Sequence, residues 1–208
     1  MTRYTSDSVL IYYAGTNIPI NKLEIKDTEK LQKYEQKLLL GGYQYFHNSM
    51  TEDTIFDEVY FIELHKKTFS ELYDFAGQYR NVNISKAGST FCQARFLSEQ
   101  SKEIFGKFAR ENYLRSFHNK PVSEFANRIA YFMCELIALH PFIELNGRTI
   151  RLFFDMIAIY NGYEYIDYHS TLTQNDNDNL YIKASVECMF CNYADMERII
   201  LAGLTKSN

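Results

Sequence analysis

The chain of 208 residues carries 22 Lys and Arg against 26 Asp and Glu, which gives a formal net charge of −4. No overall basic field attracts nucleic acid or an anionic membrane, so neither is expected as a partner, and any anion site must be local. Hydrophobic residues make up 46% of the chain and charged residues 23%, with no run that reads as a transmembrane segment. This composition indicates a globular chain, and its length suits a single domain over residues 1–208.

The first half of the sequence predicts an arm, two helices and a hairpin. Residues 1–25 show no hydrophobic period and contain several turn formers, so we expect an extended N-terminal arm. Asp27 is placed to cap a helix that ends near residue 46. A second helix is predicted over residues 54–75, with Val59 and Leu64 among its inward side chains. Polar and apolar residues then alternate over 81–91, which predicts a short β-hairpin, the alternative being an irregular loop.

The rest of the chain reads as helical, which makes the predicted fold class mainly α. A helix over 121–139 is apolar nearly all round and is therefore expected at the centre of a bundle. The proline at 141 must end it, because proline disfavours helical geometry in the residue before it. The other predicted helices cover residues 98–114, 146–160, 175–190 and 193–204.

Four cysteines are present, at positions 92, 134, 188 and 191. Cys188 and Cys191 form a lone CxxC, and a zinc site would need a second pair, so a zinc site is not favoured. The start of the chain lacks the pattern of a secretory signal peptide. We therefore expect reduced thiols and a cytoplasmic location, with delivery to another cell left open.

Residues 140–151 form the stretch with the most chemistry. Gly147, Arg148 and Arg151 stand where a helix begins, and such an N-terminus binds anions through its unpaired N–H groups. His140 has a side chain that can accept a proton near neutral pH, and Glu144 could bind Mg²⁺ beside a phosphate. Taken singly, His140 could be a helix cap and Glu144 could form a surface ion pair with Arg148. Taken together, they indicate phosphoryl or nucleotidyl transfer to a hydroxyl.

The stretch resembles the Fic (filamentation induced by cyclic AMP) family, whose motif is HxFx(D/E)GNGRxxR. Seven motif positions match: His140, Phe142, Glu144, Asn146, Gly147, Arg148 and Arg151. Residues 21–35 are similar to the segment that opens many Fic domains, and the predicted hairpin is similar to the family's flap. The resemblance implies a Fic-type helical bundle and a protein adenylyltransferase, which moves AMP from ATP to a Ser, Thr or Tyr hydroxyl of a target protein and releases pyrophosphate.

The resemblance also implies a role for each motif residue. His140 would be the catalytic base, Phe142 the core anchor and Glu144 the Mg²⁺ ligand. The nucleotide would be bound at Asn83, Ile84, Ser85, Lys86, Leu145, Asn146, Gly147, Arg148, Arg151 and Tyr181. Within this set, the two arginines would grip the β- and γ-phosphates, and the flap residues 83–86 would also pin a target segment by strand pairing.

Leu145 departs from the motif, which has glycine at this position. Leucine disfavours positive φ and adds bulk. Two outcomes are open: an ordinary backbone with the side chain turned away, or a reshaped anion hole. The alternatives to adenylyl transfer are therefore a Fic-fold phosphotransferase or other nucleotidyltransferase, and a catalytically impaired nucleotide-binding or interaction module.

Regulation gives one further expectation. Many Fic proteins are inhibited by a helix with the pattern (S/T)xxxE(G/N), whose glutamate pairs with the second arginine of the motif. Thr54 and Glu58 have the spacing, but Val59 follows them and breaks the pattern. We therefore expect the inhibitor, if there is one, to be a separate small antitoxin protein, in which case this chain would be the toxin of the pair.

Overall fold

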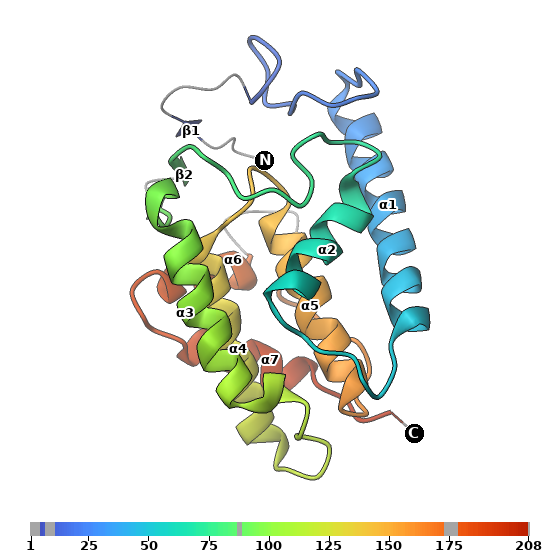
Figure 1. The fold of residues 1–208 in the computed structure, drawn as a ribbon, viewed down its shortest axis with the longest axis vertical. Coiled ribbons are helices and arrows are strands. Elements are labelled where there is room, and N and C mark those ends of the chain that lie inside the picture. The colour runs from blue at the N-terminus through green and yellow to red at the C-terminus, as the bar shows by residue number, and fades with distance from the viewer. Residues whose placement is uncertain (1–4, 7–10, 87–88, 173–178, 208) are drawn as a thin grey trace.

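The structure is a computed structural model that describes residues 5–6, 11–86, 89–172 and 179–207. It is mainly helical, as predicted, and Figure 1 shows the arrangement of its helices. The α-helices are α1 (Thr28–Ser49), α2 (Glu58–Phe69), α3 (Leu97–Arg110), α4 (Val122–Leu139), α5 (Asn146–Tyr160), α6 (Leu180–Cys188) and α7 (Ala194–Gly203). Two short 3-10 helices, η1 (Ala94–Phe96) and η2 (Asn112–Leu114), flank α3.

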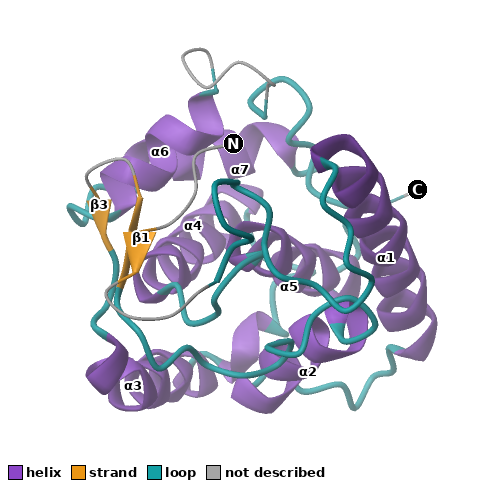
Figure 2. Cartoon of the chain, turned by 90° about the horizontal axis from the view of Figure 1, so that it is seen from above, coloured by secondary structure: helices purple, strands orange, loops and turns teal. Residues whose placement is uncertain are grey.

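Helix α4 is central, as its apolar sequence predicted. It contacts α3, α5, α6 and α7, and Figure 2 shows α4 and α5 in the middle with the other helices around them. Its buried side chains include Phe125, Ile129, Phe132 and Met133, each at most 1% exposed. The helix ends at Leu139, and His140, the residue before Pro141, is no longer helical. The polar loop that follows therefore begins deep in the molecule.

Local signals set several helix ends. Asp27 caps α1 by accepting a hydrogen bond from the Lys30 N–H at 2.8 Å, as predicted. Helix α2 is shorter than predicted and ends at Phe69, where the carbonyl of Phe69 accepts from the N–H groups of Leu72 and Tyr73 in a turn. The polar run at 175–179 lies mostly outside the described residues, but Asn179 caps α6 through Ile182 N–H at 2.9 Å.

The predicted hairpin is present as β2 (Ile84–Lys86) and β3 (Ser89–Thr90), which pair antiparallel. A third strand, β1 (Thr5–Ser6), pairs antiparallel with the other edge of β2, so the sheet order is β1-β2-β3. Farther along the arm, Tyr12 and Pro19 form a β-bridge. The N-terminal arm is thus part of the flap rather than separate from it.

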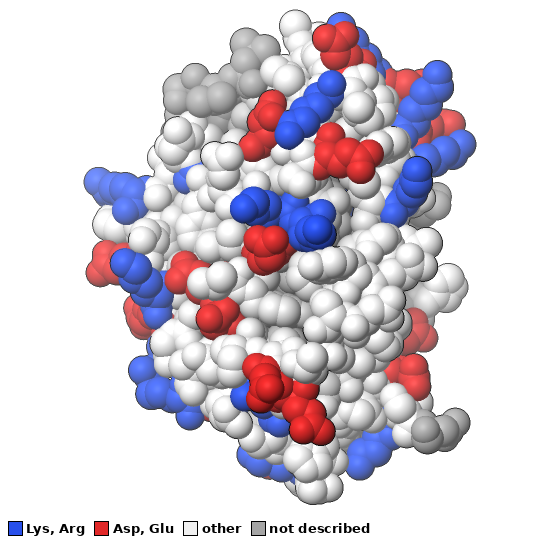
Figure 3. Space-filling view, turned by 45° about the vertical axis from the view of Figure 1, so that its right-hand side comes forward, with Lys and Arg blue, Asp and Glu red and all other residues white. Residues whose placement is uncertain are grey.

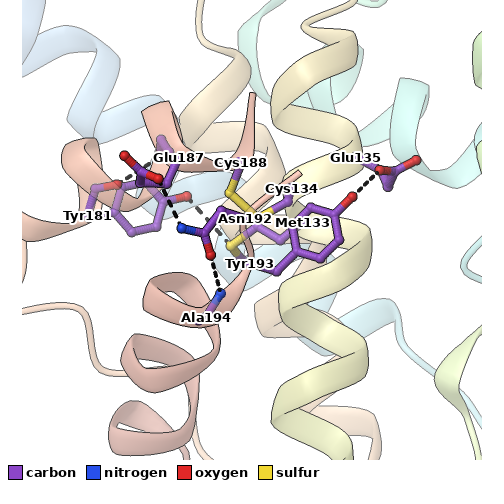
Figure 4. The surroundings of a disulfide bond; sticks show 10 residues. Met133, Cys134, Glu135, Tyr181, Glu187, Cys188, Asn192, Tyr193 and Ala194 are labelled. Atoms are coloured by element: carbon purple, nitrogen blue, oxygen red, sulfur yellow. Dashed lines mark hydrogen bonds between the residues drawn. A yellow bond between two sulfur atoms is a disulfide. The ribbon is translucent and has the colours of Figure 1, made fainter. Parts of the chain in front are cut away.

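The expectation of four reduced thiols is wrong for two of the cysteines. Cys134 on α4 and Cys188 at the end of α6 form a disulfide, which Figure 4 shows between the two helices. The cause is packing: α6 lies against α4, and the two Cα atoms are 5.0 Å apart. Cys92 and Cys191 are free thiols.

The surface carries both charge signs. Figure 3 shows acidic and basic side chains interspersed over one face, with no large area of a single sign. Over the described residues, every helix is too short or too polar to cross a membrane.

Candidate functional site

The polar loop between α4 and α5 begins and ends with residues in the left-handed backbone conformation. His140 has φ 46° and Leu145 has φ 65°. Leu145 thus takes the glycine-like backbone that its side chain disfavours, which contradicts the ordinary backbone of the first of the two outcomes left open for this position. Its side chain is buried in an apolar cluster with Ile18, Leu31 and Phe69. Burial of that side chain offsets the cost of the positive φ.

Three contacts fix the loop from inside. Phe142 is fully buried and stacks on His65, with ring centroids 3.9 Å apart, which places it as the predicted core anchor. The Asn146 side chain accepts a hydrogen bond from the Phe142 N–H and donates one to the Phe142 carbonyl, both at 2.8 Å. The Asn146 amide thus braces the loop, while the backbone N–H of Asn146 lies at the start of α5.

His65 supports the loop and was not predicted as a functional residue. Its Nδ1 accepts a hydrogen bond from the Gly77 N–H at 2.8 Å, so Nε2 is the nitrogen that donates to the Glu144 carbonyl at 3.1 Å. Burial lowers the pKa of His65 to about 4, which keeps the ring neutral. Its spacing with the buried Phe61 and Phe69 on α2 is the sequence signal that could have found it.

Arg80 is the second residue that the sequence did not reveal. It is 3% exposed, and its guanidinium donates to the carbonyls of His140 (2.8 Å), Val82 (2.7 Å) and Cys92 (2.5 Å). The backbone N–H of Arg80 donates to the Pro141 carbonyl at 2.8 Å. A buried cation thus ties the start of the flap to the loop. A single arginine before a hairpin carries no pattern that would predict this role.

His140 is buried and neutral. Its pKa is lowered to about 3, mainly by burial; the hydrogen bond with the Ile137 carbonyl raises it, and the positive charges of Arg80 and Lys86 lower it. Its Nδ1 lies 3.2 Å from the Ile137 carbonyl, which can only accept, so Nδ1 carries the proton. Nε2 is then the unprotonated nitrogen and can accept a proton from a hydroxyl. Phe91, which follows β3, stacks on the imidazole ring.

The surroundings of Glu144 disfavour the ionised form of its carboxyl group. Its pKa is raised to about 6, mainly by burial; a hydrogen bond from Tyr12 and the charge of Lys86 lower it, and the charge of Glu35 raises it. Tyr12 donates that bond to Oε1 at 2.5 Å. A divalent cation would favour the ionised form, so the residues present fit Mg²⁺.

The N-terminus of α5 contains the predicted anion-binding groups. The first N–H bonded within the helix is that of Thr149, to the Leu145 carbonyl, so the N–H groups of residues 146–148 precede the helical pattern. A Cβ on Gly147 would lie 3.5 Å from Nη1 of Arg151, which places this glycine beside that guanidinium. Arg148 Nη1 donates to Glu35 on α1 at 2.5 Å.

Arg151 lies among aromatic rings. Its guanidinium carbon is 5.1 Å from the centroid of Tyr181 and 6.0 Å from that of Tyr168. Tyr181 is buried against the second motif arginine, which is where the structure places this predicted nucleotide contact. In the described part of the chain, Glu35 pairs with Arg148, the first arginine of the motif. The expectation of a separate inhibitor stays a prediction.

The predicted flap residues lie along β2. Lys86 is close enough to lower the pKa of both His140 and Glu144 by its charge. Ser85 pairs with Thr90 on one side and with Thr5 on the other. Ile84 is buried against Tyr12 and Val82. Asn83 accepts a hydrogen bond from the Ala94 N–H at 2.9 Å. The structure thus brings the flap, the candidate base His140 and the carboxyl group of Glu144 together in one site.

Comparison with known proteins agrees with this geometry. The sequence model of the Fic/DOC family matches residues 55–158, half of the chain. The chain belongs to the Fic/DOC family. It is 30% identical over 167 residues to a probable protein adenylyltransferase, y4lH of Sinorhizobium fredii, with 79% of this chain and 82% of that protein covered. It is 33% identical over 192 residues to the protein adenylyltransferase VbhT of Bartonella schoenbuchensis, with 92% of this chain and 38% of VbhT covered.

Solved structures share this Fic/DOC fold. The chain is similar to the BepC protein of Bartonella tribocorum, solved with bound AMPPNP, at a TM-score of 0.80 and 21% identity, with 95% and 97% of the two chains covered. An N-terminal Fic domain from Bartonella quintana, solved with bound ADP, gives a TM-score of 0.76 at 23% identity, with 95% of each chain covered. The Fic-type helical bundle with a hairpin flap, predicted from the sequence, is confirmed.

Proposed function

We propose that this chain is a protein adenylyltransferase that uses ATP as donor, with His140 as base. One observation carries the proposal: a neutral, buried histidine whose Nε2 is the basic nitrogen stands in the same loop as a helix N-terminus with two arginines. A target hydroxyl would attack the α-phosphorus of ATP and pass its proton to Nε2. The bond between the α- and β-phosphates would break, and pyrophosphate would leave. The adenylyltransferase names of the relatives support the same reaction.

The phosphates would be bound at the start of α5. The backbone N–H groups of Asn146, Gly147 and Arg148 offer hydrogen bonds to an anion, and the guanidinium groups of Arg148 and Arg151 offer charge to the β- and γ-phosphates. Glu144 would hold Mg²⁺, which would neutralise charge on the phosphates. The left-handed backbone of Leu145 supports an intact anion hole, because the side chain is buried away from it.

The target protein would be bound at the flap. Strand β2 is paired on both edges, by β1 and β3, so an extended target segment must replace β1 or add to an outer strand. Replacement of β1 is favoured because this two-residue strand gives up few backbone hydrogen bonds. The target, a separate antitoxin and the single-domain organisation of residues 1–208 remain proposals.

Labelled nucleotides test the reaction. The protein is incubated with cell lysate and either α-labelled or γ-labelled ATP, and labelled proteins are identified by mass spectrometry. Adenylyl transfer predicts labelling from the α-label alone, whereas a phosphotransferase would transfer the γ-label. GTP, UTP and CTP with the same α-label test the choice of donor. Bound ATP with neither label transferred would favour an impaired nucleotide-binding module.

The base assignment needs its own control. His140→Ala should reduce labelling by about 100-fold or more, the usual contribution of a general base, while ATP binding measured by calorimetry stays close to that of the wild type. His169→Ala, at an exposed histidine, should change neither. Equal labelling by the His140 variant would contradict the assignment.

A further inference from the structure

Glu35 on α1 makes two short hydrogen bonds that join three separate parts of the chain. Its Oε1 accepts from the Tyr73 hydroxyl at 2.5 Å, and its Oε2 accepts from Arg148 Nη1 at 2.5 Å. The glutamate side chain is 8% exposed and that of Arg148 is 16% exposed. Burying a carboxylate without partners is costly, and this one accepts hydrogen bonds from a phenol and a guanidinium.

Glu35 lies on a face of α1 that is packed against the site. Leu31, one turn earlier on the same face of α1, is buried in the cluster that also contains Leu145 and Tyr73. The inner face of α1 therefore packs against the loop whose last residue precedes α5. An arginine side chain is long and flexible, and a fixed carboxylate restricts it to one arrangement. Arg148 is thereby held at the start of α5 before any ligand binds.

We propose that Glu35 and Tyr73 are positioning residues, which hold the Arg148 guanidinium where it grips the terminal phosphates of the nucleotide. This rests on the proposed function. Glu35 orients the guanidinium through one N–H, and the planar group still has other N–H donors for phosphate oxygens. Tyr73 acts one step further away, because its hydroxyl fixes the other carboxylate oxygen.

Nucleotides of different phosphate number separate a positioning role from a structural one. The test measures Kd for ATP, ADP and AMP by calorimetry, with kcat and KM for labelling, in the wild type, Glu35→Gln and Tyr73→Phe. Glu35→Gln should weaken ATP binding about tenfold, the scale of one charge-assisted hydrogen bond, and leave AMP binding nearly unchanged. Tyr73→Phe should shift the ratio of ATP to AMP affinity in the same direction by less, because the Glu35–Arg148 contact remains.

A matched pair elsewhere provides the control. Arg128 donates to Glu111 through both Nε and Nη2, and this partly buried pair joins the residue after α3 to α4. Glu111→Gln removes a comparable charge pair without touching the candidate site. It should lower the melting temperature by an amount similar to Glu35→Gln, but the ratio of ATP to AMP affinity should stay that of the wild type.

Three results would overturn the proposal. If Glu35→Gln lowers the melting temperature with an unchanged ratio of ATP to AMP affinity, the contact is only structural. If it strengthens ATP binding, Glu35 competes with phosphate for Arg148. If the wild type binds none of the three nucleotides, the proposed function itself fails, which is a different result from an unchanged ratio. Should Glu35→Gln not fold, Tyr73→Phe decides by the same ratio.

Discussion

Phe91 stacks on His140, with ring centroids 3.8 Å apart and ring planes 18° from parallel. Phe91 follows directly after β3, so the flap itself covers the candidate base. The contact helps to bury the imidazole ring, and burial is the main cause that lowers its pKa to about 3. A histidine in this environment stays neutral over the range where an exposed histidine binds a proton.

Phe91→Ala should therefore change the pH dependence of labelling. Without the phenyl ring, the imidazole is more exposed and its pKa rises toward the usual value of about 6.5. The base then becomes protonated as the pH falls below that value, so kcat/KM should fall between pH 7 and 5 more steeply than in the wild type. The measurement is a pH profile of labelling together with an NMR titration of His140. Phe96→Ala, at a partly exposed ring in η1, is the control. Superimposable profiles for Phe91→Ala and the wild type would contradict this prediction.

Tyr12 should control the protonation of Glu144. The pKa of this carboxyl is about 6, and the Tyr12 hydrogen bond lowers it. Tyr12→Phe should raise that pKa, so the carboxylate is lost at a higher pH as the solution is acidified. As the pH falls from 8 to 6, the Mg²⁺ concentration that gives half-maximal labelling should then rise more for Tyr12→Phe than for the wild type. Tyr13→Phe, which removes a hydroxyl bonded to the Asn21 carbonyl, should leave it unchanged. A Mg²⁺ dependence equal to that of the wild type would count against the role of Glu144.

Leu145→Gly should keep labelling activity and lose stability. The backbone is already left-handed, so glycine restores the motif without a change of loop conformation. Loss of the buried side chain costs more than the relief of positive φ returns, which leaves a net loss of about 2 kcal/mol in the free energy of unfolding. Urea denaturation measures this. Leu72→Ala, in the same cluster, should lose stability without affecting the loop. A large gain in labelling by the glycine variant would show that leucine impairs the anion hole.

The disulfide should contribute to stability. It closes a sequence separation of 54 residues, and the chain-entropy model gives at most about 4 kcal/mol for a loop of that length. A reducing agent should lower the urea midpoint of the wild type, whereas Cys188→Ser should have the lower midpoint with or without it. Cys191→Ser, at an exposed free cysteine three residues later, should behave as the wild type. If the reducing agent leaves the urea midpoint of the wild type unchanged, the disulfide does not form in solution.

Removal of residues 1–10 should increase labelling of target proteins. Strand β1 covers one edge of β2, and its loss frees backbone groups with which an extended segment can pair. ATP affinity should stay close to that of the full chain, because the α5 N-terminus is untouched. The comparison is the rate of target labelling at saturating ATP. A lower rate would indicate that β1 supports the flap rather than competing with the target.

Short-range features of this chain could be predicted from its sequence. The Asp27 cap, the end of α4 before Pro141 and the hairpin each depend on neighbouring residues. The buried face of α2 was harder to predict. Val59 was predicted to face inward and is 71% exposed, whereas His65 is fully buried. Periodicity gives the existence of an apolar face more reliably than its exact direction.

The contacts that hold the site together join residues that are far apart in the sequence. Arg80 reaches carbonyls 59 and 60 residues later in the chain, and Glu35 meets an arginine 113 residues away. Such pairs depend on how the helices pack, which no local pattern encodes. The same holds for Cys134 and Cys188, which meet only because α6 lies against α4. The motif could be recognised from the sequence, but the residues that hold it in place, such as Arg80 and Glu35, could not.

The two ends of the chain differ in their distance from the site, and this decides where an affinity tag belongs. Thr5 pairs with β2 of the flap, so a tag joined shortly before it would lie beside the edge of β2 that is proposed to bind the target. Lys206 bridges to Tyr163, just beyond the end of α5 that is farthest from Asn146. A tag placed after residue 208 is therefore the one whose labelling data would report on the enzyme alone.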